Sequence, residues 1–204
     1  MPEKEQTWAV AKEYMELGIE HILKGYDHLL FIVCLVLLAG TFKRILITVT
    51  GFTVAHSITL ALAALEVIKV SVAPVEATIA LSIVFVAMEL ARNRRYTLTW
   101  RYPIAVSSTF GLLHGFGFAS VLTEIGLPQT EIPAALLFFN LGVEIGQIIF
   151  VIVAIATFFA GKRLIAALRN LTFNDILTRI QRPAGYVVGT LAMFWTIDRV
   201  AGFW

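Results

Sequence analysis

Long apolar runs constrain the fold of this chain more than any other feature of its sequence. Of its 204 residues, 58% are hydrophobic, and the mean hydropathy of +0.82 is well above that of a soluble domain. A helix needs about 20 apolar residues to cross a bilayer core of about 30 Å. The runs predict an all-α polytopic membrane protein with six transmembrane helices, in one domain covering residues 1–204. The six predicted spans are residues 17–40, 45–67, 72–90, 103–123, 132–160 and 184–201.

The basic residues predict how these spans are oriented. Eleven lysines and arginines fall in the first, third and fifth loops, whereas the other loops hold only Lys69 with Glu124 and Glu131. Since Lys and Arg accumulate on the cytoplasmic side, both termini are predicted outside. The expected location is the bacterial cytoplasmic (inner) membrane. The eleven residues are Lys43, Arg44, Arg92, Arg94, Arg95, Arg101, Lys162, Arg163, Arg169, Arg179 and Arg182.

Two further segments are predicted beside the spans. Residues 1–16 form an acidic outer segment, and no signal peptide is expected because it lacks a basic start followed by an apolar core. Residues 162–182 place Leu164, Leu168 and Leu171 at helical spacing among basic residues, which predicts an amphipathic helix on the cytoplasmic leaflet. The net charge of +2 does not indicate a nucleic-acid partner. Glycine-rich helix faces suit a homodimer as well as internal packing.

All four histidines of the chain lie inside or at the edge of a predicted span. An ionisable side chain in the bilayer is costly and marks a functional site by default. Imidazole suits nickel, zinc, copper and iron. We therefore predict a metal site within the membrane, with a divalent transition metal as its partner. The predicted ligands are His21, Asp27, His28, His56, His114 and Glu144.

Spacing along the helices predicts that these groups share one depth. His56 comes 12 residues after Arg44 and His114 comes 13 after Arg101. At about 1.5 Å per residue, both lie about 18–20 Å from the basic loops, near the midplane. His28 and Glu144 reach a similar level from the opposite side.

The pair His21 and His28 leaves two alternatives open. A separation of seven residues puts both on one helix face but about 10 Å apart along a straight helix. One metal held at about 2 Å by each nitrogen cannot join them over that distance. Either Gly25 breaks the helix, or His21 belongs to a second, outer site. Lys24 could also pair with Asp27 at i+3.

Several polar residues are predicted around this site rather than in it. Asn140, Glu144 and Gln147 form one polar stripe at i, i+4 and i+7, and such a stripe faces the interior of a bundle. Glu76 and Glu89 would be entrance and exit carboxylates for a cation, although Glu89 could simply pair with Arg92. The secondary residues are Glu76, Glu89, Asn140, Ser57 and Gln147.

The spacing His21-x3-Gly25-x-Asp27-His28 resembles the signature of the HupE/UreJ family, hydrogenase- and urease-accessory membrane proteins regarded as nickel or cobalt permeases. The resemblance covers about residues 17 to 150 and implies that His21, Asp27 and His28 are needed for metal passage. Ile22 stands where the nickel-carrier form of the motif has proline, which is typical of a sister branch. Further matching stretches are residues 52–59, 75–76, 82–89, 110–117 and 139–147.

Four functions are compatible with these features. The first is a secondary permease for Ni²⁺ or Co²⁺ and not an enzyme. The second is an intramembrane hydrolase that holds Zn²⁺ with the same cluster and uses Glu144 as general base, although no His-Glu-x-x-His motif is present. The third is a bis-histidine haem protein, and the fourth is a structural membrane partner without metal.

Overall fold

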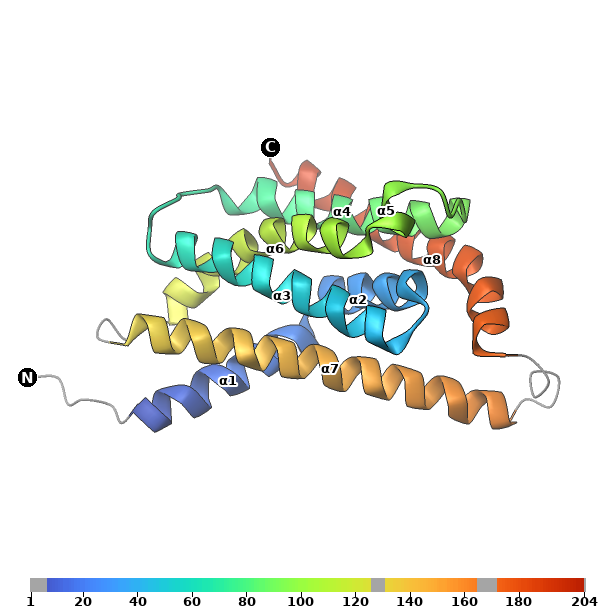
Figure 1. Ribbon diagram of the computed structural model, residues 1–204. Helices are drawn as coiled ribbons and strands as arrows, with labels where there is room; N and C mark the ends of the chain where they lie inside the picture. Colours follow the sequence, from blue (N-terminus) through green and yellow to red (C-terminus); the bar gives the residue numbers. More distant parts are fainter. Residues whose placement is uncertain (1–6, 126–130, 165–171, 204) are drawn as a thin grey trace, which may run out of the picture.

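The computed structural model describes residues 7–125, 131–164 and 172–203, and every element in this part of the chain is a helix (Figure 1). This agrees with the predicted all-α fold. The helices are α1 (Thr7–Lys24), α2 (Tyr26–Ala39), α3 (Phe42–Ala64), α4 (Val72–Arg92), α5 (Leu98–Arg101), α6 (Pro103–Ile125), α7 (Ile132–Leu164) and α8 (Phe173–Ala201).

Within the described residues, three helices are long and apolar enough to cross a membrane by themselves, namely α3, α4 and α7. The pair α1 and α2 adds a fourth crossing if the two are counted as one bent span. Helices α3, α4, α6 and α7 coincide with predicted spans to within a few residues. The total of six spans and the outside placement of the termini stay predictions.

The first predicted span is wrong in one respect, because it is not one continuous helix. The chain bends by 73° between α1 and α2, at Gly25. Gly25 has φ −78° and ψ 92°, outside the helical range. Its N–H donates to His21 O of α1 at 3.0 Å, while its carbonyl accepts from Leu29 N–H of α2 at 3.0 Å. A Cβ on Gly25 would lie 2.8 Å from His28 Nδ1 and 2.9 Å from His21 O, which explains why glycine stands there.

The predicted helix over residues 162–182 is also divided differently in the structure. Residues 162–164 end α7, and residues 173–182 begin α8, which continues without interruption to Ala201. Thr172 starts α8 by exchanging bonds with Asp175 in a capping box. Ile176 and Leu177 are buried against the rest of the bundle rather than turned to a lipid surface. Leu164, Leu168 and Leu171 lie outside the described side chains.

Glycines bring the helices together in three close pairs. On α6 a Cβ at Gly115 would lie 2.3 Å from His56 O of α3, and on α7 a Cβ at Gly142 would lie 2.1 Å from Met15 O of α1. On α8 a Cβ at Gly185 would lie 2.6 Å from Ala87 O of α4. Small residues permit such backbone contact inside a bilayer. The bundle therefore consists of the pairs α3 with α6, α1 with α7 and α4 with α8.

Helix α2 lies in the middle of these pairs (Figure 1). It contacts α3, α4, α6, α7 and α8, and most of its residues from His28 onward are buried. A helix that is apolar on all sides is either enclosed by other helices or exposed to lipid, and the burial of α2 shows that other helices enclose it. The first turn of α2 carries Asp27 and His28 into the centre of the bundle.

Candidate metal centre

The bend at Gly25 brings His21 and His28 together. Their ring centroids lie 4.6 Å apart, far closer than a straight helix permits. Of the two alternatives that the sequence left open, the structure therefore shows the first: Gly25 breaks the helix, and His21 at the end of α1 lies beside His28 at the start of α2. Lys24 points to another partner, because its ammonium group bonds to Glu20 rather than to Asp27.

His56 of α3 completes a group of three imidazoles. One ring nitrogen from each of His21, His28 and His56 lies within 4.8 Å of the other two. His28 is 6% exposed and His56 is fully buried, so bulk water does not compete for these nitrogens. A metal with nitrogens at about 2.1 Å holds them about 3.4 Å apart in a tetrahedral set, within reach of small side-chain rotations. Among the described residues, this is the group with metal-ligand spacing.

Asn140 determines which nitrogen of His56 is free. Its Nδ2 donates to Leu136 O at 2.7 Å, so its Oδ1 is the atom that faces His56 Nδ1 at 3.4 Å. An amide oxygen only accepts, and Nδ1 must therefore carry the proton. The lone pair of His56 is then on Nε2, which is buried and has no hydrogen-bond partner. Metal-binding histidines are oriented in this way.

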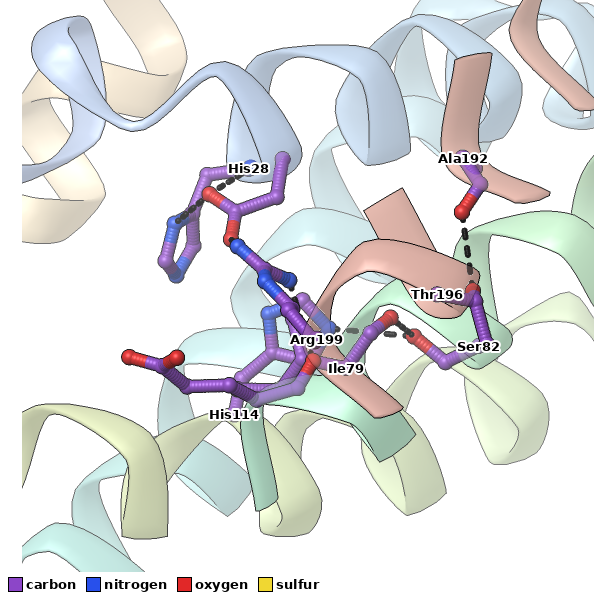
Figure 2. A network of polar contacts seen from close by, with 9 residues as sticks. His28, Ile79, Ser82, His114, Ala192, Thr196 and Arg199 are labelled. Atoms are coloured by element: carbon purple, nitrogen blue, oxygen red, sulfur yellow. Dashed lines mark hydrogen bonds and ion pairs between the residues drawn. The ribbon is translucent and has the colours of Figure 1, made fainter. Parts of the chain in front are cut away.

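Ser82 determines which nitrogen of His114 is free, as Asn140 does for His56 (Figure 2). The hydroxyl of Ser82 donates its one proton to Ile79 O at 2.6 Å, so at 3.2 Å it accepts from His114 Nε2. This leaves the lone pair of His114 on Nδ1, which is also buried without a partner. The His114 ring lies 5.1 Å from the His28 ring between centroids, next to the three-histidine group but not part of it.

The carboxylate of Asp27 lies between the imidazole of His28 and the guanidinium of Arg199. Its Oδ1 lies 3.3 Å from His28 Nδ1, and its Oδ2 lies 3.3 Å from Arg199 Nη2 of α8. Arg199 also donates to Glu76 O at 2.9 Å. Asp27 is therefore placed beside the group of three rather than within it, where it can orient His28 and offset its charge.

Glu144 and Gln147 link α7 to α3 instead of joining the histidines. Thr50 Oγ1 donates to Glu144 Oε1 at 2.5 Å, and Thr53 Oγ1 donates to Gln147 Oε1 at 2.8 Å. Glu144 Oε2 is buried without a partner. Glu144 is not one of the residues whose ligand atoms meet within the group of three, and its role as a ligand stays a prediction.

The ligand atoms of the remaining secondary residues are not among those that meet in the three-histidine group. Glu76 is exposed, and Ser57 donates to Thr53 O of its own helix at 2.7 Å. Glu89 is buried and accepts a hydrogen bond from Thr97, not from Arg92. Their assignment as path residues is a prediction that these contacts do not test.

Aromatic rings that sequence reasoning did not single out enclose the imidazoles. The Phe118 centroid lies 3.9 Å from the His21 centroid, and Phe139 lies 5.6 Å from it. Phe52 stacks on His56 with centroids 6.0 Å apart. Phe52 precedes His56 by four residues, and this spacing was the available signal, since i and i+4 share a helix face. These rings keep water out and strengthen electrostatic contacts inside.

A bundle of apolar helices that encloses imidazoles with unpartnered nitrogens defines a helical membrane protein with an internal site suited to a transition-metal ion. A family model described as HupE / UreJ protein matches residues 1–199. The chain belongs to the HupE/UreJ family, and the match extends from the first helix as far as Arg199. No curated protein and no solved structure matches the chain.

Proposed function

We propose that this protein is a secondary permease for a divalent transition-metal ion, Ni²⁺ or the chemically similar Co²⁺, which is its substrate. The observation that carries the proposal is the convergence of unpartnered, buried imidazole nitrogens from three helices. A buried polar atom without a partner is unfavourable by about 1–3 kcal/mol, so several in one place favour a ligand that satisfies them together.

The donor set selects a class of ion. Imidazole nitrogen suits Ni²⁺, Co²⁺, Zn²⁺ and Cu²⁺, whereas Mg²⁺ and Ca²⁺ require oxygen ligands. The proposed ligands are His21, His28 and His56, with His114 and Glu144 as further predicted ligands and Asp27 orienting His28. The resemblance to nickel and cobalt permeases agrees with this set. With the termini outside, the membrane potential would draw a doubly charged ion inward with about 4.6 kcal/mol per 100 mV.

A permease must release its ion, but three imidazoles in a dry site bind a metal ion tightly, so some feature of the site must weaken this binding. Arg199 is such a feature, since its guanidinium is paired with Asp27 directly beside His28. This fixed positive charge repels a divalent ion in the site and weakens its binding. The acidic residues 1–16 and Glu76 would collect cations outside, and Glu89 would lie on the exit path.

Uptake of radioactive nickel into proteoliposomes tests the proposal. We expect saturable uptake by the native protein and its loss in His28→Ala. Thr190→Ala is a matched control, because the exposed hydroxyl of Thr190 donates to Tyr186 O of its own helix and the residue has no assigned role in the site. Tight nickel binding without flux would contradict a permease, and full uptake in His28→Ala would contradict the proposed role of His28 in the site.

An intramembrane zinc hydrolase is the second candidate, favoured by three histidine ligands with an open coordination position. Its proposed general base, Glu144, instead accepts a hydrogen bond from Thr50. Elemental analysis of protein purified without added metal separates the two. Stoichiometric, non-exchanging zinc favours the hydrolase, and readily exchanged nickel favours the permease.

A further inference from the structure

A polar cavity lies at the end of α2 that is far from the histidines. It has a volume of about 380 Å³ and lies between the end of α2, the start of α3 and the first turns of α8. Leu38, which lines it, is ten residues beyond His28, or about 15 Å along the helix. The cavity is therefore separate from the candidate metal centre.

Two arginines give this cavity a positive charge. Arg44 and Arg95 line it, and no carboxylate is among the described residues that do so. Arg95 is held in place, because its guanidinium lies 5.4 Å from the Trp100 ring centroid and its Nη2 donates to Thr178 Oγ1 at 3.4 Å. A cavity of this charge repels metal cations and attracts anions.

Two buried polar atoms of the lining side chains have no partner. Trp100 Nε1 is a donor only, and its hydrogen is unused. Gln181 is 3% exposed, and its Nε2 donates to Leu37 O at 2.8 Å, which leaves Oε1 as an unused acceptor. A ligand that satisfies both atoms offers an acceptor to Trp100 Nε1 and a donor to Gln181 Oε1, and the two arginines favour an anionic acceptor.

We propose that this cavity binds a phosphate group that bears a hydroxyl. The phosphate oxygens accept from the guanidinium groups of Arg44 and Arg95 and from Trp100 Nε1, and the hydroxyl donates to Gln181 Oε1. Guanidinium matches phosphate geometry with two parallel bonds. The phosphoglycerol headgroup of an anionic lipid and protonated inorganic phosphate share this chemistry. Basic cavities between membrane helices commonly hold lipid headgroups.

Binding to the purified protein in a neutral detergent tests the proposal. Phosphatidylglycerol, phosphatidylcholine and inorganic phosphate are titrated, and bound species are counted by native mass spectrometry. The test variant is Arg44→Gln with Arg95→Gln. The control is Arg92→Gln with Arg101→Gln, which removes the same charge from two exposed arginines outside the cavity.

We expect phosphatidylglycerol to bind about tenfold more weakly to the cavity variant and unchanged to the control, since each lost charge-assisted bond reduces affinity severalfold. Trp100→Phe keeps an aromatic ring beneath Arg95 but removes the N–H together with the five-membered ring of the indole, so about threefold weaker binding is expected. Phosphatidylcholine, which is zwitterionic and has no headgroup hydroxyl, is expected to bind weakly to all variants.

A competition experiment between phosphatidylglycerol and inorganic phosphate distinguishes the two possible sources of the phosphate group. Displacement of phosphatidylglycerol by millimolar inorganic phosphate assigns the cavity to a soluble anion, and resistance assigns it to the lipid headgroup. Equal losses in the cavity and control variants, or no loss in either, would overturn the proposal.

Discussion

Asp27 and Arg199 are 172 residues apart in the chain, yet Asp27 Oδ2 lies 3.3 Å from Arg199 Nη2. The other oxygen of Asp27 lies 3.3 Å from His28 Nδ1. One carboxylate thus connects a central imidazole to a positive charge on the last helix. A divalent ion at His28 and the guanidinium compete for the same negative charge.

Replacement of Arg199 by glutamine is expected to strengthen metal binding. The change removes a positive charge near the site and frees Asp27, so nickel affinity should rise by roughly tenfold while transport slows at saturation. Calorimetric titration with nickel measures the affinity. Arg92→Gln, at an exposed position, serves as the charge control. Unchanged or weaker binding in Arg199→Gln would contradict a role of this pair in release.

Replacement of Gly25 by alanine is expected to disturb the histidines directly. The added Cβ would lie 2.8 Å from His28 Nδ1, so the ring must move. Nickel affinity should fall by roughly tenfold, and stability by about 1–3 kcal/mol. Gly161→Ala is the control, since no atom lies within 4 Å of its Cβ position. Equal affinities in the two variants would show that the bend does not assemble the site.

Asn140 is expected to affect metal affinity because it fixes the proton of His56 on Nδ1. Asn140→Leu removes the acceptor at Nδ1 and should weaken metal binding by about 10- to 100-fold, whereas Asn140→Asp keeps an acceptor and should retain most of the affinity. Titrations with nickel on both variants decide this. If the leucine and aspartate variants lose affinity equally, Asn140 serves packing rather than the orientation of His56.

Gly115 is expected to be essential for the contact of α6 with α3. A Cβ there would lie 2.1 Å from Thr59 Oγ1 and 2.3 Å from His56 O, so Gly115→Ala should lower stability by about 1–3 kcal/mol. Gly189→Ala, where the nearest atom lies at an ordinary 3.4 Å, should change it little. Melting temperatures in detergent compare the two variants. A tolerated alanine at Gly115 would contradict the packing described.

Helical rise alone predicted much of the site. Counting residues from the two ends of the predicted spans placed His28, His56 and His114 at one level, and the structure brings the rings of His56 and His114 to within 6.4 Å and 5.1 Å of the His28 ring. The same counting placed Glu144 at that level, but depth does not determine which neighbour a side chain faces, and Glu144 meets Thr50.

Other features depend on single residues or on packing between distant segments. The bend at Gly25 follows from one backbone dihedral, which periodicity over 24 residues of a predicted span does not register. The contact of Arg199 with Asp27 depends on how α8 packs in the bundle. The orienting bond from His114 to Ser82 likewise joins two helices that are not adjacent in the chain.

X-ray absorption spectroscopy of the nickel-loaded protein tests the central claim most directly, because the scattering of imidazole rings identifies histidine ligands. We predict three imidazole nitrogens at about 2.1 Å from one nickel ion, with one fewer in His56→Ala. A first shell made only of oxygen atoms, unchanged by that substitution, would contradict a metal site formed by His21, His28 and His56.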